Sequence, residues 1–307
     1  MTGAVRIGVD FGGTKIEAAA LSPAGDYLTR KRQPTPRDYD RALRVVKDLI
    51  AEVEAEVGAT GPIGVGSPGS ISPRTGLMRN ANSTYLNGRQ FDRDLETTLG
   101  RPVRVVNDAN CLALSEAMDG AAAGHSSAYA IIVGTGCGGG LVVGGQLVNG
   151  ANGLAGEWGH MPLPWPRADE TPGPKCWCGL NNCMETWVSG TGFARDFNEH
   201  TGRNLNGEAI VEAARAGDAE AVAAFDALLD RLARGMAVVC NLVDPDAFVF
   251  GGGLSKVPEI YDRLPKLIEP YVFSDGWSAT IAPAKWGDSS GVRGAAWLWA
   301  QSETTDA

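Results

Sequence analysis

Residues 5–15 read VRIGVDFGGTK and residues 130–140 read AIIVGTGCGGG. Each stretch begins as an apolar run, as in a buried strand, and ends in a turn rich in glycine. Such turns expose backbone N–H groups with no side chain in the way, and these groups bind phosphate. Two of them about 120 residues apart indicate a duplicated unit that holds one polyphosphate between its halves.

The order of predicted elements also repeats. In the first half we expect strands at 5–9, 16–21, 27–33, 63–66 and 103–106, and helices at 38–57, 92–99 and 109–122. In the second half we expect strands at 128–133, 140–143, 146–148 and 247–250, and helices at 189–199, 207–216, 219–242, after 255 to about 271, and 291–299. A βββαβα order that occurs twice implies two α/β domains that face each other across a cleft.

The boundary between these domains is expected to be a hinge, because no low-complexity linker separates the halves. We place residues 1–115 and about 290–307 in a smaller N-terminal domain with the first phosphate turn. Residues 116–289 then form a larger domain with the second turn.

Composition limits the classes of partner. Apolar residues make up 44% of the chain and charged residues 21%, as in an ordinary globular protein. The net charge of −9 argues against nucleic acid as a partner. No apolar stretch approaches the roughly 20 residues of a membrane helix, so no membrane partner is expected. Six unevenly spaced cysteines and no signal peptide pattern favour a reducing, cytoplasmic location.

The first turn carries groups that suit a nucleotide. Asp10 is placed to hold Mg²⁺ through water, Thr14 to donate to a phosphate oxygen, and Lys15 to offset charge. A simple hairpin turn with an aspartate cap would contain the same residues. The matching second turn and the later Gly251-Gly252-Gly253 favour nucleotide binding. Neither a P-loop nor a dinucleotide fingerprint is present.

A second candidate site is Asn107-Asp108, which directly follows the strand predicted at 103–106. A carboxylate at a strand end can accept a hydroxyl proton while the neighbouring amide fixes another hydroxyl. Asp108 could equally cap the helix that follows. Position alone leaves both interpretations open.

The third candidate is a metal site. One histidine and three cysteines, spaced closely within a loop rich in proline and glycine, match tetrahedral zinc: His160, Cys176, Cys178 and Cys183. Since these residues fill all four positions, the ion would be structural. The alternative is a set of small buried side chains. The same loop carries Glu157 and Glu185, whose carboxylates are suited to recognise several sugar hydroxyls.

With these residues assembled, the chain resembles the sugar kinases of the ROK family (repressors, unannotated reading frames and kinases), in particular the bacterial fructokinase and mannokinase type. The resemblance runs from Ile7 to Trp299. It rests on the stretches DFGGTK (10–15), NANSTYLNG (80–88), NDANC (107–111) and GEWGH (156–160), on the zinc loop, and on GDSSGVRGAAW (287–297).

The resemblance implies a ribonuclease-H/actin-like, hexokinase-like fold in which a C-terminal helix returns to the N-terminal domain. It implies that Asp108 is the catalytic base. It also implies that the sugar is bound by Asp108 together with Gly69, Asn82, Asn107, Glu157, His160 and Glu185. It implies nucleotide-binding glycines at Gly12, Gly13, Gly134, Gly136, Gly251 and Gly252. The family's zinc loop usually has glycine before the third cysteine, where this chain has Asn182; asparagine tolerates left-handed backbone, so the zinc is retained.

The expected activity is therefore transfer of the γ-phosphate of MgATP to the 6-hydroxyl of a hexose. The 80–88 segment favours D-fructose, with mannose as a further substrate. Backbone donors around Thr14 and Thr135, with Mg²⁺ near Asp10, would neutralise the developing charge. The family's usual form is a homodimer.

Alternatives remain within and outside this activity. Glucose, N-acetylhexosamines or mannose could be the substrate, and polyphosphate could replace ATP. A non-catalytic sugar-sensing protein belongs to another class, because the family includes repressors with a DNA-binding segment before the kinase-like part. Here the first phosphate turn begins at Asp10, and retention of Asp108 with both turns argues for catalysis.

Overall fold

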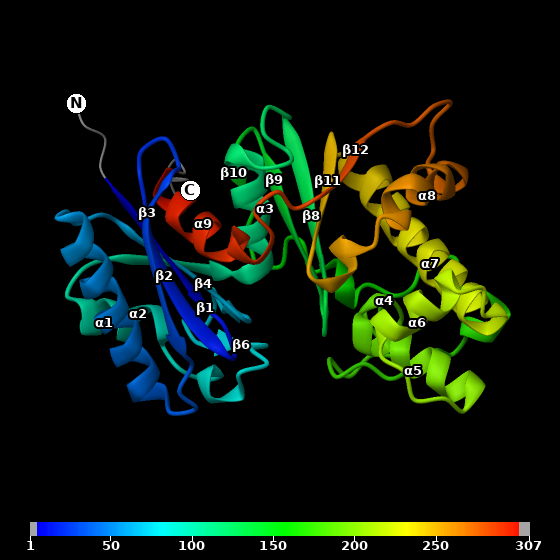
Figure 1. Cartoon of the computed structure of the whole chain (residues 1–307), viewed down its shortest axis with the longest axis horizontal. Coiled ribbons are helices and arrows are strands. Elements are labelled where there is room, and N and C mark those ends of the chain that lie inside the picture. The colour runs from blue at the N-terminus through cyan, green and yellow to red at the C-terminus, as the bar shows by residue number, and fades with distance from the viewer. Residues whose placement is uncertain (1–4, 301–307) are drawn as a thin grey trace. The chain divides into compact units, whose positions relative to one another are not determined.

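The structure is a computed structural model that describes residues 5–300, and Figure 1 traces its elements. The chain divides into two compact units. The first comprises the chain up to Gly124, Gly140–Ala155 and the chain from Lys285 onward; the second comprises His125–Gly139 and Gly156–Ala284. These boundaries differ from the expected ones at 115/116 and about 290, because helix α3 (Asp108–Asp119) runs across residue 115. Residues 301–307, which we expected in the N-terminal domain, lie outside the described residues.

The first unit is built on a sheet in the order β3-β2-β1-β4-β7. Its strands are β1 (Arg6–Phe11), β2 (Lys15–Leu21), β3 (Tyr27–Pro34), β4 (Ile63–Ser67) and β7 (Val103–Asn107). The pairs β1–β2 and β2–β3 are antiparallel, whereas β4 runs parallel to both β1 and β7. Because parallel strands end at the same edge, Asp10 near the end of β1 and Asn107 at the end of β7 come to one edge of the sheet.

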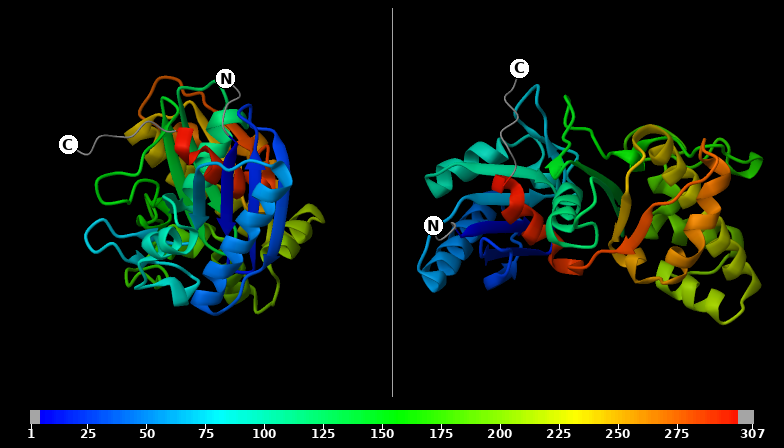
Figure 2. Two further views of the ribbon diagram at one scale, coloured as in Figure 1. Left: turned by 90° about the vertical axis from the view of Figure 1, so that its left-hand side faces the viewer. Right: turned by 90° about the horizontal axis from the view of Figure 1, so that it is seen from above.

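Helices cover both faces of this sheet (Figures 1 and 2). Helices α1 (Tyr39–Val57) and α2 (Phe91–Leu99) lie on one face, and α3 and α9 (Ser290–Trp297) on the other. Alternate residues of β1, namely Ile7, Val9 and Phe11, are fully buried in the core shared with α1 and α2. Asp38 caps α1, since its side chain accepts a hydrogen bond from the Arg41 amide.

Helix α9 packs directly on the strand backbones. A Cβ atom at Gly8 would lie 2.0 Å from the Val292 carbonyl oxygen, and one at Gly64 would lie 1.9 Å from that of Ala295. Only glycine permits this approach. The expectation that a C-terminal helix returns to the N-terminal sheet is therefore confirmed, and α9 is followed by a 3₁₀ turn over Leu298–Ala300.

The second sheet repeats the topology of the first in the order β10-β9-β8-β11-β12. Its strands are β8 (Ser127–Val133), β9 (Cys137–Val143), β10 (Gln146–Leu147), β11 (Ala247–Gly251) and β12 (Thr280–Pro283). In both sheets three consecutive strands are followed by two crossover strands, which confirms the predicted duplication. Strand β12 was missed, because its four residues include proline and are only partly covered.

The remaining helices belong to the second unit. They are α4 (Glu185–Val188), α5 (Gly190–Thr201), α6 (Gly207–Arg215), α7 (Ala219–Val243) and α8 (Glu259–Ile268). The first unit also contains a short two-stranded ribbon of β5 (Ser70–Ile71) and β6 (Met78–Arg79). Within the described residues, no helix combines the length and apolar character needed to cross a bilayer.

A buried ion cluster fixes the long loop that precedes α4. Arg234 and Arg231 of α7 bind both oxygens of Glu170 at 2.7–2.9 Å, and Arg234 also donates to the carbonyl oxygens of Pro164 and Trp165. Burial alone would raise the pKa of Glu170, but the bonds from Arg234, the Arg167 amide and Arg231 outweigh it and lower the pKa to about 2. The loop is therefore anchored to the longest helix of the unit.

Candidate active-site residues

Two aspartates, Asp10 and Asp108, lie at the strand-end edge of the first sheet. Desolvation by burial, followed by the charge of Asp108, raises the pKa of Asp10 to about 7, although Lys15 opposes the shift. Gly291 at the start of α9 lies against Asp10, where a Cβ atom would come within 3.1 Å of the carboxylate. The structure therefore places Asp10 and Asp108 near enough for the charge of one to affect the other.

Hydrogen bonds from Thr35 hold the first glycine turn, Gly12-Gly13-Thr14, in place. Gly12 N–H donates to the Lys15 carbonyl oxygen at 3.0 Å and closes the turn. The Thr35 hydroxyl donates to the Gly12 carbonyl oxygen at 2.7 Å, and the Thr35 amide to that of Thr14 at 3.0 Å. Gly13 and Thr14 remain exposed at the tip, so their backbone is accessible to a ligand.

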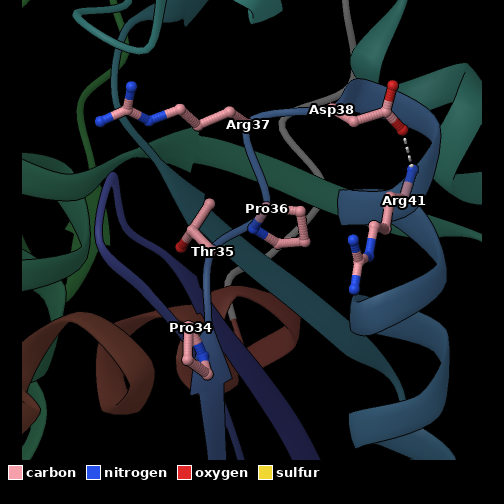
Figure 3. Close-up of a pocket in the computed structure, with 6 residues that line it drawn as sticks. All are labelled: Pro34, Thr35, Pro36, Arg37, Asp38 and Arg41. Atoms are coloured by element: carbon pink, nitrogen blue, oxygen red, sulfur yellow. Dashed lines mark hydrogen bonds between the residues drawn. The ribbon is translucent and has the colours of Figure 1, made fainter.

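Thr35 also lines an open surface pocket of about 540 Å³ (Figure 3). The other lining residues are Pro34, Pro36, Arg37, Asp38 and Arg41. None of them is among the residues expected in the site. The dashed line in Figure 3 is the α1 cap, from the Arg41 amide to Asp38.

Glu17 on β2 is a buried acid that the sequence did not indicate as a site residue. Glu17 is 1% exposed, lies opposite Asp10 in the strand register, and contacts Lys15 Nζ at 3.3 Å and Arg30 Nε at 2.9 Å. Its interaction with Lys15 fixes that ammonium near the turn. The available signal was a single charged residue inside an otherwise apolar strand.

Asn107 and Asp108 share the start of α3. Asn107 Oδ1 caps the helix by accepting from the Ala109 amide at 2.8 Å, and its Nδ2 donates to the Gly69 carbonyl oxygen at 3.1 Å. Asp108 Oδ1 accepts from the same amide at 2.8 Å. Asn107 is therefore the N-cap of α3, and Asp108 is the first residue of the helix. Asn82 lies exposed in the loop after Ala81, whose backbone packs against Gly69.

In the second unit, two further glycine turns lie against each other. Gly134 N–H donates to the Gly136 carbonyl oxygen at 3.0 Å, and Thr191 Oγ1 donates to that of Thr135 at 2.7 Å. A Cβ atom at Gly252, which has a φ of 77°, would lie 2.4 Å from the Val133 carbonyl oxygen. The structure thus brings the 134–136 turn and Gly251-Gly252 together.

The four expected metal ligands form one cluster. The ligand atoms of His160, Cys176, Cys178 and Cys183 all lie within 4.8 Å of one another. Cys176 Sγ is 3.6 Å from His160 Nδ1, and Cys178 Sγ is 3.6 Å from Cys183 Sγ. Tetrahedral zinc with bonds of about 2.3 Å to sulfur separates its ligands by roughly 3.8 Å, so the set fits that ion.

The backbone at Asn182 supports the same loop. Its φ of 64° is left-handed, as expected where the family has glycine. The asparagine also adds a contact that glycine lacks, because its Oδ1 accepts from Trp187 Nε1 at 2.6 Å. Trp187 in turn stacks under the Arg231 guanidinium at 4.1 Å, which connects the loop to α7.

The acidic sugar-binding candidates flank this cluster. Glu157 is exposed and directly precedes the 3₁₀ turn Trp158–His160, which Trp158 anchors to β9 by donating to the Gly138 carbonyl oxygen at 2.9 Å. Glu185 begins α4 and accepts from the Cys137 amide at 2.9 Å. The second unit therefore places Glu157, His160 and Glu185 around one loop, beside the 134–136 turn.

Comparison with known proteins identifies the family. The sequence pattern of the ROK family matches residues 6–302. The chain belongs to the ROK family. Among curated relatives of this ROK protein, N-acetyl-D-glucosamine kinase of Pectobacterium atrosepticum is 39% identical over 296 residues, which cover 95% of this chain and 97% of the relative. The enzyme of the same name from Photobacterium profundum is 38% identical, covering 95% and 98%.

Solved structures agree with this family fold. The ROK hexokinase from Thermus thermophilus has a TM-score of 0.85 and 32% identity, covering 95% of this chain and 96% of that one. A ROK family glucokinase from Streptomyces griseus, in complex with glucose and AMPPNP, has a TM-score of 0.76 and 29% identity, covering 96% and 99%. The expected hexokinase-like α/β fold is therefore confirmed.

Proposed function

We propose that this ROK-family sugar kinase transfers the γ-phosphate of MgATP to the 6-hydroxyl of N-acetyl-D-glucosamine. The observation that carries the choice of sugar is the end-to-end similarity to N-acetyl-D-glucosamine kinases, at 39% identity for the Pectobacterium enzyme. This substrate was an alternative in the sequence analysis, where the 80–88 segment favoured D-fructose. The relatives support the alternative better than fructose.

Asp108 is the proposed base. Its position beside Asn107 at the strand-end edge suits acceptance of the 6-hydroxyl proton as the phosphoryl group transfers in line. Asn107 would fix a neighbouring hydroxyl while holding the Gly69 carbonyl. Of the remaining sugar-binding candidates, Asn82 comes from the first unit and Glu157, His160 and Glu185 come from the second.

The glycine turns are the proposed phosphate binders. Gly12, Gly13, Thr14 and Lys15 serve in the first unit, and Gly134, Thr135, Gly136, Gly251 and Gly252 in the second. MgATP supplies the phosphoryl group and the cation that neutralises its charge. Asp10 would hold Mg²⁺ through water, because a carboxylate beside a second one favours a cation that relieves their repulsion.

Zinc is the proposed structural ion of the second unit. The donor set of one imidazole and three thiols is typical of closed zinc sites, and four protein ligands leave no position for a substrate. The ion would fix the loop that carries Glu157, His160 and Glu185. A cytoplasmic homodimer remains our expectation for the assembled protein.

A coupled ADP-release assay tests the choice of sugar. With ATP as donor, N-acetyl-D-glucosamine should give the highest kcat/KM among N-acetylglucosamine, N-acetylmannosamine, glucose, mannose and fructose. A higher kcat/KM for fructose would restore the first expectation, and phosphorylation of none of these would reject the sugar kinase assignment. A parallel arm with polyphosphate tests the donor.

Glucose is the second candidate substrate. The structural similarity to the Thermus thermophilus ROK hexokinase supports it, at a TM-score of 0.85. The same assay distinguishes the two, because a site that binds the 2-acetamido group discriminates against a sugar that lacks it.

A further inference from the structure

An exposed tryptophan lies inside the zinc-binding loop. Trp177 separates the ligands Cys176 and Cys178, and 63% of its surface is exposed. Although most of its surface is open to solvent, two contacts hold the indole in place.

Two of the proposed sugar-binding residues make those contacts. Trp177 Nε1 donates to Glu185 Oε1 at 2.6 Å, a short bond between a neutral donor and a charged acceptor. The indole ring also meets the His160 ring edge to face, with centroids 4.9 Å apart and planes at 87°. One side chain thus links the metal loop to both residues.

The Trp177 bond completes the orientation of the Glu185 carboxylate. Its other oxygen, Oε2, accepts from the Cys137 amide at 2.9 Å, so each oxygen has one fixed donor. An ionised carboxylate offers about four lone-pair sites. Roughly two acceptor sites therefore remain for sugar hydroxyls, and their direction is set by the two donors.

We propose that Trp177 is a positioning residue that orients Glu185 for sugar binding. Without the indole N–H, Oε1 loses its donor and the carboxylate can rotate toward solvent. Affinity for the sugar should then fall, whereas the chemistry at Asp108 should change little. That Glu185 binds the sugar rests on the proposed function, whereas the hydrogen bond between Trp177 and Glu185 does not depend on it.

The substitution Trp177→Phe tests the role, because it keeps an aromatic ring against His160 and removes only the N–H donor. We expect KM for the sugar to rise about tenfold, since a hydrogen bond to a charged group contributes about that factor. The kcat should stay within about twofold, and the zinc content should equal that of the wild type. An unchanged KM would overturn the proposal.

Trp165→Phe is the matched control. Trp165 lies in the same unit and is 50% exposed, but its ring stacks on Tyr271 at 5.2 Å instead of touching the sugar-binding candidates. This variant should keep the wild-type KM. A rise equal to that of Trp177→Phe would show that loss of any exposed indole is sufficient and would overturn the proposal.

A double-mutant cycle separates positioning from simple packing. If Trp177 acts through Glu185, the double variant Trp177→Phe/Glu185→Gln should bind sugar about as weakly as Glu185→Gln alone. Additive losses in isothermal titration would contradict the proposal. The sugar with the highest kcat/KM for the wild type is the probe, so a failure of N-acetylglucosamine changes the probe and not the test.

A spectroscopic measurement is independent of activity. The indole ¹H–¹⁵N signal that is missing from Trp177→Phe belongs to Trp177. It should shift in Glu185→Gln, because the acceptor loses its charge, and it should stay in place in Glu157→Gln. A Trp177 signal that does not respond to Glu185→Gln would refute the contact, even in a protein that phosphorylates no sugar.

Discussion

The two equivalent glycine turns are supported in different ways. The turn at Gly12-Gly13-Thr14 is held by Thr35 and is surrounded by charge, with Asp10 and Lys15 on either side. The turn at 134–136 carries no charged residue and is held by the α4–α5 segment, through Thr191 and Glu185. In the proposed function, the first copy of the duplicated unit carries the proposed base and charged phosphate turn, whereas the second carries the His/Cys cluster and most of the sugar-binding candidates.

The largest expected effect tests the charged copy. Asp108→Asn should lower kcat by about 10²–10⁴, the usual contribution of a general base. The asparagine oxygen can still accept from the Ala109 amide, so the helix start is preserved. Sugar affinity by titration should stay within about threefold, because the proton acceptor acts in the transition state. Turnover close to that of the wild type would remove Asp108 as the base.

The second prediction tests the copy that carries the His/Cys cluster. Cys178→Ser removes one of the four clustered ligands and, because Cys178 is exposed, opens no cavity in the core. Bound zinc should be lost, and sugar affinity should fall at least about tenfold, as for weakened metal-site support. Metal analysis and titration measure the two effects together. A zinc-free variant with full sugar affinity would show that sugar binding does not depend on the metal in this loop.

The third prediction compares the two supports directly. Thr35→Val and Thr191→Val each remove a hydroxyl bond of 2.7 Å to a turn carbonyl while keeping the side-chain shape. Each should raise KM for ATP about fivefold, the value of about 1 kcal/mol per hydrogen bond. Steady-state kinetics at saturating sugar measures the effect. A response of only one variant would show that only that turn binds the nucleotide.

The smallest expected effect concerns pH. The pKa of Asp10 is raised to about 7, whereas an unfolded aspartate ionises near 3.9. Between about pH 4 and 7 the folded protein keeps a proton that the unfolded chain releases, so raising the pH lowers the free energy of unfolding. Without Mg²⁺ or ATP, Tm should fall by a few degrees over this range. Asp10→Asn should show a smaller decrease, and an identical decrease would contradict the raised pKa.

Local patterns were sufficient to predict the strands that bear the turns and the duplicated order. The apolar run ending at Asp10 and the cluster of three cysteines are short-range signals, and both appear where expected. The repeat of strand order followed from the same runs. These features could be predicted because neighbouring residues determine them.

Features that depend on distant contacts could not be predicted. The burial of Glu17 follows from pairing with Asp10 across β1–β2 and from Arg30 on β3. The hydrogen bond from Trp177 to Glu185 forms only because the loop folds back on the start of α4, and the grouping of Gly140–Ala155 with the first unit follows no sequence boundary. Strand β12 is short and depends on its partner β11. In each case the determining neighbour lies outside the local pattern.

The glycine-mediated contact of α9 with β1 and β4 constrains biosynthesis. During translation β1 emerges from the ribosome long before Ser290 is added, so the part of the sheet face that α9 covers stays open while the intervening chain is made. The second unit, which is complete at Ala284, needs no later segment. The chain can therefore complete its second unit before the first unit acquires α9, its last element.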